Sequence, residues 1–321
     1  MKCRFLAALV ATLFLSVTHA SAQAWPTKPI RLVAPYPPGG QTDVVSRYFA
    51  DKLSGVLGQQ VIVDNKAGAN GMLGMEIVKN TPADGYTFVY VNSSMMCINP
   101  YVYKKLPYDG FKDFVPVTQH GLAPLAMVTP PSLGLKSVKA FVAWSRERKG
   151  TVNYASFGIG SSSHIWGEML NQAEKLDMVH VPYKGAGPAI QDTLSGHIPV
   201  TIQDLAASGP SIAAGKLNAL AVTSSVRWPR FPDIPTFNEL GYTINLTGWN
   251  GIMAPAGTPK DIVERMSAEI RKLVQTSEGR ERLLDMGLFA TGTTPAEMTE
   301  IMRNGCAAWG DAVKRAGVEP E

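Results

Sequence analysis

The sequence carries little excess of charge of either sign. Its 30 Lys and Arg residues against 26 Asp and Glu residues give a formal net charge of +4 over 321 residues. Removal of an N-terminal leader that contains Lys2 and Arg4 lowers this charge to +2. A chain so close to neutral lacks the basic surface that nucleic-acid binding requires, so we expect no nucleic-acid partner.

Cysteine is also scarce, with three residues in the chain. Cys3 precedes the apolar N-terminal run, which leaves Cys97 and Cys306 in the mature protein. No histidines or cysteines stand at the spacing of metal ligands, so we predict no metal site. Two cysteines in an oxidising compartment can pair or can remain separate buried thiols. Both alternatives stay open, because sequence alone cannot place their Cα atoms within bridging range.

Signature motifs of nucleotide and hydrolase chemistry are missing. There is no Gly-x-x-x-x-Gly-Lys-Ser/Thr loop and no Gly-x-Ser-x-Gly elbow. The pair Gly158 and Gly160 begins a dinucleotide fingerprint, but Ser163 stands where the third glycine belongs. We therefore predict a protein that is not an enzyme and binds no cofactor. A secreted hydrolase that uses Ser161 or Ser162 is the rival from another class.

The one long apolar run lies at the N-terminus, where Lys2 and Arg4 precede the stretch Phe5–Val17. Small residues follow at Ala20-Ser21-Ala22, at the spacing that a signal peptidase recognises. The run is shorter than the roughly 20 residues that a membrane-spanning helix needs. Residues 1–24 are therefore predicted to be a cleaved signal peptide, and the mature protein is predicted to be exported.

Short β-branched segments alternate with amphipathic ones, which predicts an α/β fold with parallel sheets and helices on both faces. The number of strands and the chain length favour two doubly wound domains. Domain 1 is predicted to comprise residues 25–123 and 250–321, and domain 2 residues 124–249. The expected strands are residues 30–34, 61–64, 86–92, 115–119, 126–129, 152–155, 178–182, 200–203 and 219–223.

The first candidate binding loop, residues 34–43, connects a strand to a helix. Tyr36 and Pro37 precede Gly39 and Gly40, and Thr42 or Asp43 is expected to cap the helix. Free N–H groups at the helix start, with the positive end of the helix dipole, would form an anion site. Spacing alone favours the alternative, a plain strand-to-helix turn, which needs the same glycines and cap.

The second loop, residues 156–164, repeats this design with more hydrogen-bond donors. Its predicted site residues are Phe157, Gly158, Gly160, Ser161, Ser162 and Ser163. Three consecutive serines exceed what one helix cap requires, which favours a ligand site. His164 would lie one turn into the helix, and we interpret it as a packing residue that forms hydrogen bonds rather than as a ligand contact.

Further candidates follow the ends of other strands, where ligands bind in open α/β sheets. Ser93 and Ser94 follow one strand, while Gln203 and Asp204 end another. Aromatic residues near the predicted domain crossings complete this group, namely Tyr183 and Trp249.

These motifs, in this order, resemble the solute receptors of tripartite tricarboxylate transporters, also called Bordetella uptake gene receptors. The resemblance covers essentially the whole mature chain. Its main elements are Trp25-Pro26, the Pro-Pro-Gly-Gly-x-x-Asp run at 37–43, Ala67–Gly71, Pro82–Thr87, Ser156–His164, Val181–Gly185 and Ala254–Pro259.

The resemblance implies a type II periplasmic binding protein whose two ligand loops grip a carboxylate in a closing cleft. It adds Asn70 to the predicted ligand-binding residues and implies handover to the membrane subunits of a transporter. We expect a monomer. A binding protein that presents the same ligand to a signalling partner is the alternative within this class.

One residue departs from the family pattern, which usually has a small residue where Phe157 stands. An aromatic side chain there would narrow the pocket or stack on a flat ligand. With Tyr36 and Trp249, it is compatible with an aromatic acid such as terephthalate or a pyridine carboxylate, and an aliphatic mono- or dicarboxylic acid stays open as the alternative. Asp204 would repel a second carboxylate, which argues against a simple dicarboxylate.

Overall fold

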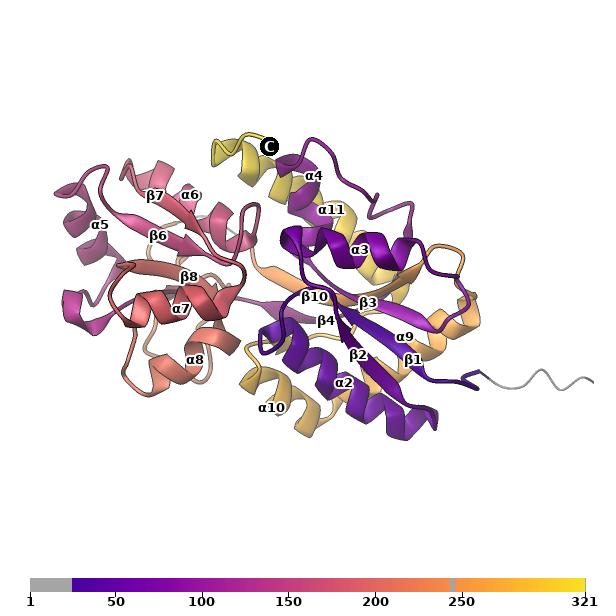
Figure 1. The fold of residues 1–321 in the computed structure, drawn as a ribbon. Helices are drawn as coiled ribbons and strands as arrows, with labels where there is room; N and C mark the ends of the chain where they lie inside the picture. Colours follow the sequence, from indigo (N-terminus) through magenta and orange to yellow (C-terminus); the bar gives the residue numbers. More distant parts are fainter. Residues whose placement is uncertain (1–24, 243–245, 321) are drawn as a thin grey trace, which may run out of the picture.

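The computed structural model describes residues 25–242 and 246–320, which form two α/β lobes side by side (Figure 1). The first lobe is built on a six-stranded sheet and the second on a five-stranded sheet. None of the helices in these residues is long and apolar enough to cross a membrane.

The first sheet has the strand order β11-β4-β10-β3-β1-β2. The bounds are β1 Ile30–Ala34, β2 Val61–Asn65, β3 Thr87–Asn92, β4 Phe114–Ala123, β10 Gly248–Pro255 and β11 Phe289–Ala290. The second sheet has the order β7-β6-β8-β5-β9. Its bounds are β5 Leu125–Thr129, β6 Asn153–Ser156, β7 Val179–Pro182, β8 Val200–Asp204 and β9 Asn218–Val222.

Helices cover both sheets. In the first lobe they are α2 Gln41–Leu57, α3 Met72–Lys79, α4 Asn99–Val102, α9 Lys260–Gln275, α10 Ser277–Asp285 and α11 Pro295–Arg315. In the second lobe they are α5 Val138–Arg146, α6 Ser162–Glu174, α7 Ala186–Leu194 and α8 Leu205–Ala213. Short helical turns occupy Ala69–Gly71, Ser94–Ile98 and Pro131–Leu133.

The α/β class and all nine expected strands are confirmed, but the expectation of purely parallel sheets is wrong. The strand β10 runs antiparallel to β3 and β4, and β5 runs antiparallel to β8 and β9. Both are the strands by which the chain enters a sheet from the other lobe. No helical crossover precedes them, so nothing constrains them to the parallel direction. The predicted boundary between residues 249 and 250 falls inside β10.

Apolar periodicity predicts the helices because it marks the face that packs on a sheet. In α2, Val45, Phe49 and Leu53 are buried against the first sheet. In α9, the residues Ile262 and Ile270 are buried in the same core.

Cys97 and Cys306 form a disulfide, which answers the question that the sequence left open. Their Cα atoms lie 4.3 Å apart although 209 residues separate them. Cys97 belongs to the helical turn after β3, and Cys306 lies in the middle of α11. The bond therefore holds α11 against the segment that follows β3, close to the boundary between the lobes.

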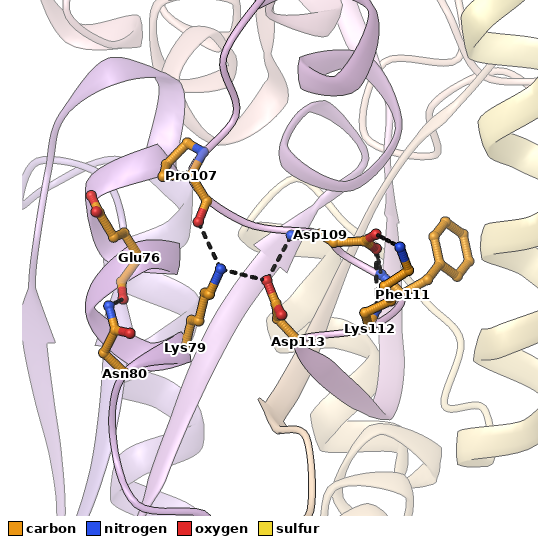
Figure 2. Close-up of polar contacts among 8 residues, drawn as sticks. All are labelled: Glu76, Lys79, Asn80, Pro107, Asp109, Phe111, Lys112 and Asp113. Carbon is orange, nitrogen blue, oxygen red and sulfur yellow. Dashed lines mark hydrogen bonds and ion pairs between the residues drawn. The ribbon is translucent and has the colours of Figure 1, made fainter.

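An ion pair and a hydrogen bond of Lys79 tie α3 to the segment that leads into β4 (Figure 2). The Lys79 ammonium lies 3.0 Å from the Asp113 carboxylate and donates to the carbonyl oxygen of Pro107 at 3.0 Å. The backbone N–H of Asp109 also donates to Asp113. Partial burial raises the pKa of Asp113, but the Asp109 N–H and Lys79 outweigh it and hold that pKa below its usual value.

Candidate functional site

A cavity of about 430 Å³ lies between the lobes, beyond the carboxyl ends of β1, β3, β6 and β8. This volume suits a small organic molecule. The predicted site residues that line it are Tyr36, Pro37, Gly39, Gly40, Ser93, Ser94, Phe157, Ser162, Asp204 and Trp249.

The first loop presents an uncapped helix start to the cavity. Gly40 is the N-cap of α2, so no side chain satisfies the first N–H groups of this helix. The expected capping by Thr42 or Asp43 is wrong, because the helix begins at Gln41 and both residues lie inside its first turn. Thr42 and Gln41 line the cavity.

Asp43 does not line the cavity but stabilises the first loop through contacts outside the cavity wall. Its carboxylate accepts from the Gly39 N–H at 3.0 Å and pairs with Arg47 at 2.9 Å. Burial raises the pKa of Asp43, but the bonds from Arg47 and Gly39 together bring it below its usual value. The charged carboxylate therefore stabilises the turn that exposes the N–H groups of α2.

Tyr36 is held in the cavity wall by a chain of side-chain amides. Its hydroxyl donates to Oδ1 of Asn70 at 2.7 Å, and Nδ2 of Asn92 donates to it at 3.4 Å. Asn70 in turn donates to Asn99 at 2.8 Å. The predicted residue Asn70 therefore supports Tyr36 and does not line the cavity itself. Burial raises the pKa of Tyr36, so its hydroxyl is neutral at physiological pH.

The second loop differs, because much of its donor capacity is satisfied by the protein. Ser161 caps α6 by accepting from the His164 N–H at 3.2 Å and donates to the Gly158 carbonyl at 2.6 Å. Ser94 of the first lobe accepts from the Ser162 N–H at 3.0 Å. Ser163 is buried and donates to the Ile202 carbonyl.

Several predicted residues thus lie outside the cavity wall: Asp43, Asn70, Gly158, Gly160, Ser161, Ser163, Tyr183 and Gln203. The Tyr183 hydroxyl donates to Asp192 within the second lobe. The Gln203 side chain is fully buried and donates to Thr201 at 2.8 Å.

Sequence reasoning missed a third helix start, that of α7. Its N-cap is Gly185, which has no side chain to offer, and the residues up to Pro188 line the cavity. A Cβ atom on Gly185 would lie 4.0 Å from Cγ of Pro37, so the α7 start faces the first loop across the cleft. The sequence pattern that could have revealed it is a strand followed by Gly185, Gly187 and Pro188. The first loop has the same arrangement of a strand, glycines and prolines before a helix.

Two charged side chains line the cavity, Asp204 and Lys184. Asp204 caps α8 by accepting from the Ala207 N–H at 2.9 Å. Burial raises the pKa of Asp204, because it disfavours the charged carboxylate more than the backbone hydrogen bonds stabilise it. Lys184 is exposed to solvent. Sequence reasoning did not place it in the site.

The geometry contradicts a serine nucleophile in the second loop. Ser161 contacts the backbone N–H of His164, not its ring. The ring nitrogen Nδ1 of His164 accepts from the Gly160 N–H at 3.2 Å, so it is not available to Ser161 or Ser162. Among the described residues, direct contacts between a serine hydroxyl and an imidazole join Ser156 to His180 and Ser195 to His197. None of these four residues lines the cavity.

The chain belongs to the family of tripartite tricarboxylate transporter receptors, whose model matches residues 45–318. The family consists of solute receptors and not of enzymes. Among curated relatives, BugT of Bordetella pertussis is 35% identical over 301 residues, which is 93% of this chain and 92% of BugT. A protein from the tcbD-tcbE intergenic region of Pseudomonas sp. strain P51 is 34% identical over 95% of this chain and 92% of its own length.

Solved structures agree in fold. An R. palustris protein solved with adipate has a TM-score of 0.90 and 32% identity, covering 92% of this chain and all of its own. The periplasmic binding protein BugD has a TM-score of 0.86 and 29% identity, with 92% and 100% coverage. MatC of Rhodopseudomonas palustris, solved with bound malate, has a TM-score of 0.84, 28% identity and 90% and 100% coverage. The chain is therefore a solute-binding receptor with the two-lobed fold of this class.

Proposed function

We propose that this receptor captures a small organic carboxylate in the periplasm and delivers it to the membrane subunits of a tripartite tricarboxylate transporter. The observation that carries the proposal is the meeting of two uncapped helix starts, α2 from the first lobe and α7 from the second, in one cavity. Adipate and malate in the solved relatives support the class of ligand.

The carboxylate would bind between Gly40 and Gly185, where backbone N–H groups lack side-chain acceptors. Each helix start contributes partial positive charge and donors that point at the anion. No fork-shaped Arg pair is needed, and the Lys184 ammonium would add longer-range attraction. Closure then follows from contacts that the ligand makes with both lobes at once.

The ligand is proposed to be aromatic. Phe157 and Tyr36 line the cavity, and the largely buried Trp249 adds a third ring. A flat acid of the terephthalate or pyridine carboxylate kind would contact these rings, whereas an aliphatic chain would gain less from them.

Asp204 would determine which chemical group the ligand can carry at the end opposite its bound carboxylate. A neutral hydroxyl or protonated acid there can hydrogen-bond to Asp204, while a second free carboxylate would be repelled. Because burial raises the pKa of Asp204, a dicarboxylate is accommodated if Asp204 takes up a proton on binding. Binding of a dicarboxylate would then be stronger at lower pH.

Export depends on the predicted signal peptide at residues 1–24, which lies outside the described residues.

A sensor that presents the bound ligand to a signalling partner is the second candidate, since it would use the same cavity. Loss of uptake on deletion of the membrane subunits would favour transport, whereas intact uptake with altered gene regulation would favour sensing.

A thermal-shift screen of the mature protein tests the ligand class with benzoate, terephthalate, adipate and malate. A ligand at 100 times its Kd stabilises the folded state by about 2.7 kcal/mol, so a true ligand gives a clear shift. No shift with any of these acids would contradict the carboxylate proposal.

The aromatic preference is tested by Phe157→Ala and calorimetry. We expect the affinity for terephthalate to fall about 10-fold and that for adipate less than about 3-fold, because only the flat ligand loses a ring contact. Equal losses for both acids would reject stacking on Phe157.

A further inference from the structure

Two imidazole rings are stacked behind the second loop and do not line the cavity. The rings of His164 and His180 have centroids 3.8 Å apart and an interplanar angle of 7°. The Tyr154 ring also stacks on His180, with centroids 5.0 Å apart. His164 lies in the first turn of α6, while His180 and Tyr154 lie on the neighbouring strands β7 and β6.

Each imidazole is hydrogen-bonded to the loop that leads into α6. Nδ1 of His164 accepts from the Gly160 N–H at 3.2 Å. Nε2 of His180 lies 2.7 Å from the Ser156 hydroxyl, which donates to the Gly158 carbonyl at 3.0 Å. The loop is thus held at both ends, immediately before Ser162 enters the cavity wall.

The bond from Gly160 requires a neutral His164 ring. Nδ1 of His164 must be bare to accept from Gly160, so the proton of this ring is on Nε2. Between Ser156 and His180 either partner can donate, so this bond forms with either tautomer of His180. A proton added to His164 would place two donors face to face and a positive charge against the neighbouring ring.

The groups packed around the pair favour neutral rings. Burial lowers the pKa of His164 to about 4, and burial together with His164 lowers that of His180 to about 3. Tyr154 donates to Glu168 at 2.6 Å, and Asn171 donates to the other carboxylate oxygen. The Glu168 carboxylate is therefore already hydrogen-bonded to residues of β6 and α6.

We propose that His164 and His180 are positioning residues that hold the loop of Gly158 and Gly160 so that Ser162 and the α6 start form one wall of the ligand cavity. The inference rests on the proposed function for its effect on affinity, but not for its effect on the loop. His164 contacts no part of the cavity and acts through the Gly160 N–H.

Two substitutions of His164 distinguish the role of its hydrogen-bond acceptor, Nδ1, from the role of its aromatic ring. His164→Phe keeps an aromatic ring in the stack but removes the acceptor, whereas His164→Asn places an amide oxygen where Nδ1 stood. In the ligand-free protein we expect amide exchange at Gly160 to be about 10-fold faster or more in His164→Phe and within about 3-fold of wild type in His164→Asn. His197→Gln, in an exposed turn, is the control and should leave this rate unchanged.

Affinity for adipate, used as the probe ligand, should follow the same order. We expect a loss of about 10-fold in His164→Phe and less than about 3-fold in His164→Asn. Unchanged exchange at Gly160 in His164→Phe would overturn the proposal, as would equal losses of affinity in the two variants.

A spectroscopic measurement on the wild type keeps the proposal testable if His164→Phe fails to fold. Imidazole ¹⁵N spectra at pH 7 should show both rings neutral, with the proton of His164 on Nε2. A proton on Nδ1 of His164 would overturn the proposal. Because this measurement and the exchange experiment use no ligand, failure of the wild type to bind any of benzoate, terephthalate, adipate and malate would count against the proposed ligand class alone.

Discussion

The two strand-to-helix loops at the lobe boundary have similar sequences but different hydrogen bonding. The first loop ends at Gly40 with no side-chain cap, while the second ends at Ser161, whose hydroxyl caps α6. Ser94 satisfies a further N–H of α6 from the opposite lobe. The uncapped counterpart of the first loop is therefore the start of α7, not that of α6. A glycine-rich turn indicates a candidate anion site, but only unsatisfied N–H groups can bind an anion.

The largest effect is expected from acid, which should destabilise the second lobe more than the first. The second lobe contains the His164 and His180 pair, whereas the first contains a single buried histidine, His120. Burial lowers the pKa of His120 to about 3, and those of the other two to about 4 and about 3. The unfolded chain binds protons below about pH 6.5, whereas the folded protein does so only near pH 3 to 4. Stability is therefore lost as the pH falls below 6.5.

The expected loss is about 2 kcal/mol for each of these histidines at pH 5 relative to pH 7. Urea unfolding at the two pH values measures it, and His164→Asn should reduce the loss by one histidine's share. A free energy of unfolding that is equal at pH 7 and pH 5 would show that the rings are not held neutral.

Gly40→Asp tests whether the α2 start binds the anion. The φ of −80° at Gly40 permits a side chain, and a Cβ there would meet only the Pro37 carbonyl at 3.7 Å. The new carboxylate would cap α2 and occupy the donors, so we expect adipate affinity to fall about 100-fold or more while stability is kept. Calorimetry and thermal unfolding measure the two effects.

Gly40→Ala is the matched control, because it adds a methyl group without an acceptor. Its affinity should stay within about 3-fold of wild type. Similar losses in both variants would show that the space at residue 40, and not the N–H groups, matters for binding.

The smallest effect is expected at the outer contact between the lobes. Arg230, which follows β9, pairs with Glu281 at 2.6 Å and with Asp285 at 2.8 Å on α10. All three side chains are largely exposed, so Arg230→Gln should change stability by less than about 1 kcal/mol at low salt. Chemical unfolding with and without added salt measures this. A loss of several kcal/mol would show that this contact helps to hold the lobes together.

The strands were predicted well because they are short segments rich in apolar and β-branched residues, and such segments are recognisable without knowledge of their partners. The direction of β5 and β10 was not predictable, since it depends on which sheet the chain enters. The predicted domain boundary between residues 249 and 250 falls within Gly248–Pro255, which is a fully buried central strand. Glycine is needed at 251, where a Cβ would lie 2.8 Å from the Thr118 carbonyl.

The candidate site was predicted in part. Tyr36, Gly40, Phe157 and Asp204 were found because ligands lie beyond strand ends in α/β sheets. Tyr183 and Gln203 follow the same rule but point their side chains into the protein, toward Asp192 and Thr201.

By itself, the sequence determined the order of strands and helices, the family and the places where glycine-rich turns meet helix starts. These features depend on periodicity and on residues adjacent in the chain. Only the tertiary structure decided the disulfide and which helix starts remain uncapped. The reason is that Ser94 contacts the Ser162 N–H, and Cys97 bonds to Cys306, at sequence separations of 68 and 209. Contacts of that range follow from how the lobes pack, and no local pattern encodes them.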